Sequence, residues 1–291
     1  MRSALARSCG ERRVLRIGPA GEALHVEQAG AGRPVLLLHG FTGSTRTLDD
    51  VAAGLREAGR STIAVDLLGH GDSEAPGDAS AYTMERCRES LVRVLEASGA
   101  GPVDVLGYSM GGRAALGLAV ARPEWVRALI LIGASAGLAD PAERAARRAS
   151  DEALAAALER DGVPAFVERW LAQPLFASQA RLGPAFRAAA HAQRLRNRAA
   201  GLAGSLRGLG AGAQPPLHAA LAALQVPMLL AVGAEDAKFR AIAEDLAHRA
   251  PRARIAVIPD AGHAAHLENR SAFLAEMLAF LNDLDDRRSR P

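Results

Sequence analysis

A serine stands between glycines in GYSMG, residues 107–111, where an apolar run ends and a small-residue helical pattern begins. The pattern G-x-S-x-G in this context is typical of a strained strand–turn–helix whose glycines let the serine hydroxyl project over the edge of a sheet. The following helix points its first amide groups at any negative charge that forms there. A helix-capping serine is the alternative. The context favours Ser109 as a reactive group.

A serine of ordinary pKa is a weak nucleophile or base and needs a partner histidine. On such an architecture the chain order is serine, acid, histidine, with the acid after the penultimate strand and the histidine after the last. AVGAEDAKF supplies Asp236 and IPDAGHAAHLE supplies His263 at these places. Glu235 and His266 are the neighbouring alternatives. We predict a relay of Ser109, His263 and Asp236.

The same chemistry requires two amide groups that can stabilise an oxyanion. The loop HGFTGS, residues 39–44, follows a predicted strand and can contribute the amide of Phe41. Met110, directly after the serine, can contribute the second. We also expect His39, on the same loop, to lie at the site and contact substrate.

These groups require a sheet whose strand ends bring distant loops together. Short apolar runs alternate with helical patterns, which favours a mostly parallel sheet covered by helices on both faces. The strand-like runs begin near residues 14, 23, 33, 61, 103, 126, 226 and 253. We therefore predict an α/β-hydrolase fold with a mostly parallel eight-stranded sheet.

The alternation of strands and helices stops between residues 135 and 216, where an Ala/Arg/Glu-rich helical pattern is interrupted by prolines. We interpret residues 135–216 as a helical cap over the strand ends. Residues 14–134 and 217–283 then form one discontinuous core domain. Residues 1–13 and the charged stretch 284–291 are predicted to be flexible tails.

The composition narrows the classes of partner. The formal charge is +3 and the pI about 9.4, yet the positive charge is scattered arginine, with Lys238 the only lysine. We therefore expect no nucleic-acid partner. No apolar run approaches the roughly 20 residues that span a bilayer, so we expect a cytoplasmic protein without membrane insertion. Cys9 and Cys87 match no disulfide or metal spacing, and no dinucleotide or phosphate loop is present. No metal and no cofactor are predicted, and the sequence leaves the oligomeric state open.

Several segments together carry a family resemblance: HGFTGS, DLLGHGDS, GYSMGGR, AERAARRASD, RWLAQPLFAS, GAEDAKFRAIA and AGHAAHLEN. From about residue 33 to about residue 280 the chain resembles the 2-succinyl-6-hydroxy-2,4-cyclohexadiene-1-carboxylate synthases of menaquinone biosynthesis. The resemblance implies elimination of pyruvate from 2-succinyl-5-enolpyruvyl-6-hydroxy-3-cyclohexene-1-carboxylate. By analogy, Ser109 would act as a general base, activated by His263 and oriented by Asp236.

The substrate that this resemblance implies carries three carboxylates, and the resemblance assigns arginines to them. Arg113, one helical turn after the serine, would reach back to the pocket. Arg147 and Arg196 match cap arginines that bind carboxylates, with Arg144 and Arg148 as alternatives in nearly the same helical register. The partner expected is thus a small polycarboxylate.

The resemblance also places Trp170 in the pocket lining and Tyr108 beside the serine, with core packing as the alternative for both. The sequence leaves two other functions open. One is a serine-dependent hydrolase of carboxylic esters or C–C bonds with the same fold. The other is a non-catalytic binding protein, which would have no use for a complete serine, acid and histidine set.

Overall fold

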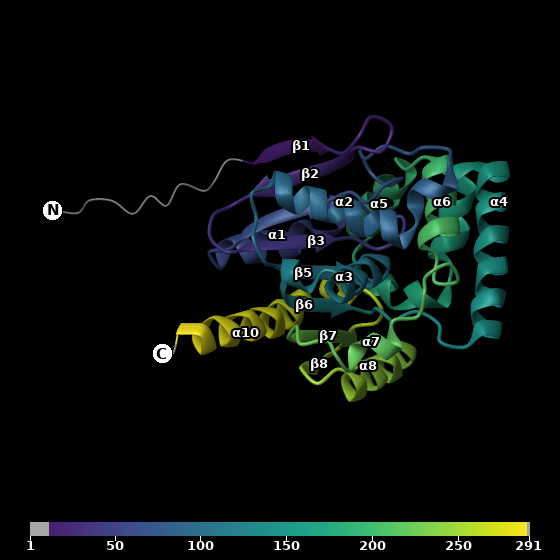
Figure 1. Ribbon diagram of the computed structural model, residues 1–291. Helices are drawn as coiled ribbons and strands as arrows, with labels where there is room; N and C mark the ends of the chain where they lie inside the picture. Colours follow the sequence, from purple (N-terminus) through teal and green to yellow (C-terminus); the bar gives the residue numbers. More distant parts are fainter. Residues whose placement is uncertain (1–11, 290–291) are drawn as a thin grey trace.

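A computed structural model describes residues 12–289 (Figure 1). One eight-stranded sheet has the order β1-β2-β4-β3-β5-β6-β7-β8. β1 and β2 pair antiparallel, as do β2 and β4, and all other neighbours are parallel. The predicted fold class is confirmed. The strands are β1 (Arg13–Ile17), β2 (Leu24–Ala29), β3 (Pro34–Leu38), β4 (Ser61–Val65), β5 (Val103–Tyr108), β6 (Val126–Ile132), β7 (Met228–Gly233) and β8 (Ala253–Ile258).

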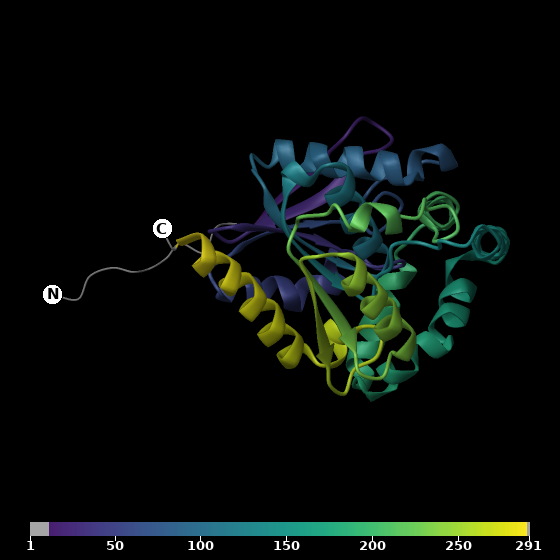
Figure 2. The ribbon, with the colours of Figure 1, turned by 60° about the horizontal axis from the view of Figure 1, so that its bottom comes forward.

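Helices cover both faces of this sheet, and Figure 2 shows α2 and α10 on opposite sides of it. Helices α2, α3 and α8 pack on one face, and α1 and α10 on the other. The elements are α1 (Asp49–Glu57), α2 (Met84–Ala97), α3 (Met110–Ala121), α7 (His218–Leu221), α8 (Ala237–Arg249), α9 (Ala265–Glu268) and α10 (Arg270–Ser289), with short 3-10 helices at Thr45–Leu48, Ala79–Tyr82, Pro123–Trp125 and Pro174–Arg181.

Strands β5 and β6 are buried on both faces, as the continuous apolar runs predict. Along β6, Leu129 and Leu131 join the core under α2 and α3, whereas Ile130 and Ile132 join the core under α1 and α10. This alternation fixes the direction of each side chain.

Between β6 and α7 the chain forms the helices α4 (Pro141–Leu171), α5 (Pro184–Leu195) and α6 (Ala199–Leu209). They lie in the segment that we interpret as a cap, and Figure 1 shows them at the carboxyl ends of the parallel strands. α4 has a kink at Gly162, whose φ is 80°, just before Pro164. The helices form their own apolar core, which includes Leu158, Phe166 and Leu202.

The expected flexible tail from residue 284 does not hold for residues 284–289, because α10 continues to Ser289. The charged stretch is held by Asp285, which forms ion pairs of 2.7 Å with both Arg60 and Arg127. At the other end, the tail predicted for residues 1–13 lies outside the described residues except for its last two, and Arg13 begins β1. Among residues 12–289, none of the helices combines the length and the apolar composition of a membrane span.

Candidate functional site

Ser109 lies in a tight turn between β5 and α3. Its φ of 52° is positive, a conformation that costs a non-glycine residue about 1–2 kcal/mol. Gly107 and Gly111 have no room for a side chain, because other backbone atoms lie too close to them. A Cβ on Gly107 would clash with the carbonyl oxygen of Gly111, and one on Gly111 would clash with that of Leu38. The spacing of GYSMGG is therefore explained by backbone crowding around a strained serine.

The serine, histidine and acid meet through two hydrogen bonds. His263 Nε2 lies 3.1 Å from Ser109 Oγ, and its Nδ1 lies 2.9 Å from Asp236 Oδ2. Because a carboxylate only accepts, Nδ1 carries the proton and Nε2 is left to accept from the serine hydroxyl. Asp236 follows β7 and also caps α8, accepting from the Phe239 amide at 3.1 Å. The three side chains thus have the geometry of a proton relay.

The competing residues lie elsewhere. Glu235 is exposed and forms a 2.6 Å ion pair with Arg181. His266 is fully buried against the ring of Tyr108 at 4.6 Å, and neither of its ring nitrogens has a partner among the described residues. Burial lowers the pKa of His266 to about 3. Neither residue takes part in the hydrogen-bonded set around Ser109.

Phe41 and Met110, the predicted sources of oxyanion-stabilising amides, line the same cavity as Ser109. Neither N–H is donated to a partner in the described part of the chain. Met110 is the first residue of α3, where an amide has no partner within its own helix. Both groups are therefore available to a ligand.

His39 supports this loop instead of lining the cavity, contrary to the expected substrate contact. Its Nε2 accepts from the Leu67 amide at 3.0 Å, so its Nδ1 carries the proton and donates to the Gly40 carbonyl at 2.8 Å. The side chain is fully buried. It ties the loop that carries Phe41 to the segment after β4.

A cavity of about 680 Å³ opens above Ser109, between the strand ends and the cap. We call it the Ser109 cavity. Its volume is within the usual range for small-molecule sites. Arg113 and Arg147 both line it, as do Trp170 and His263. Segments distant in sequence therefore contribute polar groups to one space.

Arg113 is the cation nearest to the serine in sequence, and its Nη1 donates to Gln214 Oε1 at 2.8 Å. Within residues 12–289 it forms no ion pair. Burial, together with the positive charge of Arg147, lowers its pKa to about 10, so it stays protonated at neutral pH. Gln214, which sequence reasoning missed, is itself buried and holds this guanidinium. Arg147 forms a 2.7 Å ion pair with Asp151 at one turn's spacing.

The structure also decides between neighbouring arginines of α4. Arg144 donates to the carbonyls of Leu138 and Ala139, and Arg148 donates to the Gly212 carbonyl. Neither of these alternatives lines the Ser109 cavity, whereas Arg147 does. Of the three, Arg147 is therefore the arginine that lines the cavity.

Arg196 does not reach the Ser109 cavity, contrary to the prediction. It follows the end of α5, where its side chain is 55% exposed and pairs with Asp72 at 3.0 Å. The buried arginine of this segment is Arg194, whose Nη1 donates to the Ala190 carbonyl at 2.8 Å. Neither Arg194 nor Arg196 lines the Ser109 cavity.

The two predicted aromatic residues have different positions. Trp170 lines the cavity, stacked on Phe166 at 5.7 Å and edge-on to Phe41 at 5.2 Å. Tyr108 is buried beneath the relay, with its ring 5.4 Å from that of His263. For Tyr108, core packing is what the structure shows. The ring fixes one side of the His263 imidazole.

One cluster has the composition of a metal site. His25, Asp66 and Asp72 place ligand atoms within 4.8 Å of one another. However, Asp66 already accepts from two backbone amides, those of Thr45 at 2.6 Å and Asp72 at 2.8 Å. Its carboxylate ties together the loops after β3 and β4, which accounts for its burial without an ion.

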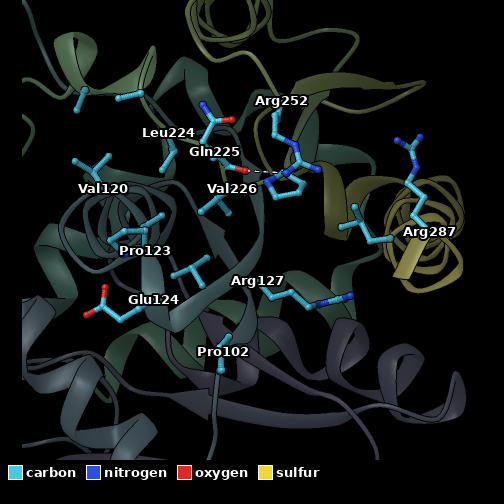
Figure 3. Close-up of a pocket in the computed structure, with 16 residues that line it drawn as sticks. Pro102, Val120, Pro123, Glu124, Arg127, Leu224, Gln225, Val226, Arg252 and Arg287 are labelled. Carbon is cyan, nitrogen blue, oxygen red and sulfur yellow. Dashed lines mark hydrogen bonds between the residues drawn. The ribbon is translucent and has the colours of Figure 1, made fainter. Parts of the chain in front are cut away.

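A second cavity of about 690 Å³ lies at the amino ends of β5 to β8. We call it the Arg252 cavity. Figure 3 shows Arg127, Arg252 and Arg287 placed around it on different elements, together with an apolar wall that includes Val226. Its lining contains no serine and no histidine, and all of its lining residues are described. Volume alone does not distinguish it from the Ser109 cavity.

Comparison with known proteins gives consistent matches. The alpha/beta hydrolase fold family matches residues 33–270. A protein of Enterobacter sp. (strain 638), named 2-succinyl-6-hydroxy-2,4-cyclohexadiene-1-carboxylate synthase, is 35% identical, covering 84% of this chain and 92% of that protein. A protein of the same name from Serratia proteamaculans (strain 568) is 33% identical, covering 88% and 96%.

A solved structure described as "Structure of MenH from S. aureus" superposes with a TM-score of 0.86 at 30% identity, covering 90% of this chain and 99% of that one. The chain therefore belongs to the alpha/beta hydrolase fold family and, within it, to the family of the 2-succinyl-6-hydroxy-2,4-cyclohexadiene-1-carboxylate synthases.

Proposed function

We propose that this protein eliminates pyruvate from 2-succinyl-5-enolpyruvyl-6-hydroxy-3-cyclohexene-1-carboxylate to give 2-succinyl-6-hydroxy-2,4-cyclohexadiene-1-carboxylate. One observation carries the proposal: the hydrogen-bonded set of Ser109, His263 and Asp236 opens into a cavity that also holds Arg113, a cation with no carboxylate partner in the described chain. A proton relay beside an unneutralised guanidinium suits a polyanionic substrate. The names of the relatives give the product, and the family resemblance implies the elimination of pyruvate that forms it.

In this mechanism Ser109 is a general base and not a nucleophile. His263 Nε2 takes the hydroxyl proton, and the serine oxygen removes the proton from ring carbon C2, which is acidic because it is α to the succinyl ketone. The negative charge develops on the ketone oxygen. The amides of Phe41 and Met110 would stabilise it there by hydrogen bonds. Asp236 stabilises the imidazolium that His263 becomes.

The elimination follows from the position of the ring double bond. The electron pair from C2 forms the C2–C3 double bond, the former C3–C4 double bond moves to C4–C5, and the C5–O bond breaks. Enolpyruvate leaves with that electron pair and, once protonated on carbon, becomes pyruvate. No water is consumed and no acyl-enzyme forms. The atoms therefore balance with the relay alone.

The cavity would hold this substrate through its carboxylates. Arg113 is fixed by Gln214 and offers its remaining N–H groups to the cavity. A planar guanidinium binds a carboxylate through two parallel hydrogen bonds. Arg147, on helix α4 of the cap, is the second proposed carboxylate-binding residue. Trp170 would provide an apolar wall for the ring.

The test is an assay in which pyruvate release and absorbance of the conjugated diene are followed together. We expect wild type to release one pyruvate per diene formed. Ser109→Ala should lose at least ~10³-fold in kcat, because the group that removes the C2 proton is gone. Ser98→Ala is the matched control, since that serine lies at the end of α2 and, in the described part of the chain, its hydroxyl donates to the Val94 carbonyl alone. It should behave as wild type.

The same experiment separates the alternatives. A hydrolase would cleave p-nitrophenyl acetate with a burst from an acyl-enzyme, and would release no pyruvate above the spontaneous rate. A binding protein would turn over neither compound. Either result would overturn the proposed elimination.

A further inference from the structure

We propose that Lys238 is the third cation of the Ser109 cavity and binds one carboxylate of the substrate, at a subsite separate from that of Arg113 and Arg147. The inference rests on the proposed function and extends it to substrate recognition. Lys238 would take the carboxylate-binding role that we expected of Arg196, which does not line the cavity. The proposed substrate has three carboxylates.

The position of Lys238 is hard to explain by stability. It is the only lysine of the chain and the second residue of α8, close to the Asp236 cap. A cation in the first turn of a helix is disfavoured by about 0.3–1 kcal/mol, because the amide dipoles already place positive charge there. Within the described residues it forms no ion pair that would offset this cost. The structure therefore offers it no internal anion.

Its surroundings place the ammonium at the edge of the reactive centre. Lys238 lines the Ser109 cavity, and its Nζ lies 5.9 Å from the centre of the Phe239 ring. That ring in turn lies 4.5 Å from the His263 imidazole. The side chain is exposed, so the ammonium stays hydrated until a ligand arrives. An unpaired charge at this place costs little in the free protein.

The three cations fall into two groups. Arg113 and Arg147 are close enough for the charge of Arg147 to lower the pKa of Arg113, whereas Lys238 has no such effect on Arg113. The arginines enter from α3 and α4, and the lysine enters from α8. A substrate with carboxylates on separate arms could contact both groups at once. A compact dianion could contact only one.

Acidic residues also line the cavity, and two of them are already engaged. Asp140 accepts from the Glu143 amide as the cap of α4, and Asp245 forms an ion pair with Arg249 at 2.8 Å. Glu143 lines the wall formed by α4. Asp245, which is on α8 like Lys238, is therefore paired with Arg249. The Lys238 ammonium remains available to a ligand.

The experiment compares three variants in the pyruvate-release assay. Lys238→Met keeps the length of the side chain and removes the charge, and we expect KM to rise about 10- to 100-fold because a charge-assisted hydrogen bond is lost. The value of kcat should change by less than about threefold. Lys238→Arg should restore most of the affinity. Arg240→Met, an exposed cation two residues further along α8 that does not line the cavity, should match wild type.

Each outcome has one meaning. Wild-type turnover with an unchanged KM in Lys238→Met would refute the lysine subsite and leave the proposed function standing. A loss confined to kcat would also refute it, because the lysine would then act on the relay and not on substrate binding. Equal effects in Arg240→Met would show a general field effect in place of a subsite. Absence of pyruvate with wild type would instead refute the proposed function itself.

Discussion

The two ends of one sheet carry cavities of nearly the same volume, about 680 Å³ at the carboxyl ends and about 690 Å³ at the amino ends. Both contain arginine, but the arginines differ in their partners. In the Arg252 cavity, Arg127 makes two short bonds to Asp104 and another to Asp285. In the Ser109 cavity, the hydrogen bond that the Arg113 guanidinium makes within residues 12–289 goes to the amide oxygen of Gln214. Arg113 and Arg127 therefore differ in unused hydrogen-bonding capacity, whereas the two cavities hardly differ in volume.

The difference follows from the topology. In a parallel sheet the loops that follow the strands leave together from the carboxyl ends, where ligands usually bind. Ser109, Asp236 and His263 all stand on such loops, after β5, β7 and β8. The amino ends receive chain that returns from helices. There Arg127 and Asp104 lie within the strands themselves and bind each other.

The largest effects should come from removing one arginine at each end, with opposite consequences. Arg127→Met leaves the fully buried carboxylate of Asp104 with only a 3.3 Å contact to Arg60. We expect a loss of about 3–5 kcal/mol in the free energy of unfolding. Arg113→Met removes a charge that burial disfavours, so its stability should hold while kcat/KM falls roughly 100-fold.

Urea unfolding and the pyruvate assay are run on both variants. They measure whether stability falls in Arg127→Met and kcat/KM falls in Arg113→Met. Gln214→Ala is an intermediate case between wild type and Arg113→Met, because it removes the hydrogen-bond partner of the Arg113 guanidinium but keeps the guanidinium. If Arg127→Met were as stable as wild type, or if Arg113→Met unfolded first, the distinction between structural and ligand-binding arginines would fail.

The residues of the reactive turn and of the relay, which lie at strand ends, could be predicted from the sequence. Gly107, Ser109 and Gly111 are recognisable because backbone crowding permits few alternatives. Asp236 and His263 follow strands whose ends the apolar pattern marks, so their meeting could be foreseen from topology.

The errors arise where position depends on helix rotation or on distant contacts. Arg196 and Arg194 are two residues apart at the end of α5, and nothing local indicates which one is buried. His39 was expected at the cavity but faces the Leu67 amide, a partner 28 residues away. The charged end of α10 is ordered by Arg60 and Arg127, which no local pattern links to Asp285.

The pH dependence of the free energy of unfolding should also distinguish the carboxyl end of the sheet from the amino end. His70 and His266 lie near the Ser109 cavity, and burial lowers the pKa of each to about 3. Because the unfolded chain binds these protons near pH 6.5 and the folded chain does not, stability is complete above pH 6.5 and falls as the pH drops from there towards 3. Two such groups remove about 3–4 kcal/mol between pH 7 and 5.

Chemical denaturation at pH 7, 6 and 5 gives this slope directly. His266→Leu removes one of the two groups and should flatten the curve by about half, while making the protein more stable than wild type at pH 5. A wild-type free energy of unfolding that stays constant across this range would show that neither buried histidine is held neutral as described.

The smallest effect is expected from Arg252→Ala. Its guanidinium donates to the Gln225 carbonyl at 3.1 Å and forms no ion pair within residues 12–289. Like Lys238, it is thus a cation without an internal anion, but no reactive group shares its cavity. An exposed substitution of this kind usually changes stability by no more than about 0.5 kcal/mol. We expect unchanged kcat and KM, measured with the Lys238 variants. A change in KM above threefold would mean that an unpaired cation at the amino ends also serves the substrate, and the contrast between the two cavities would then have to rest on their position along the strands alone.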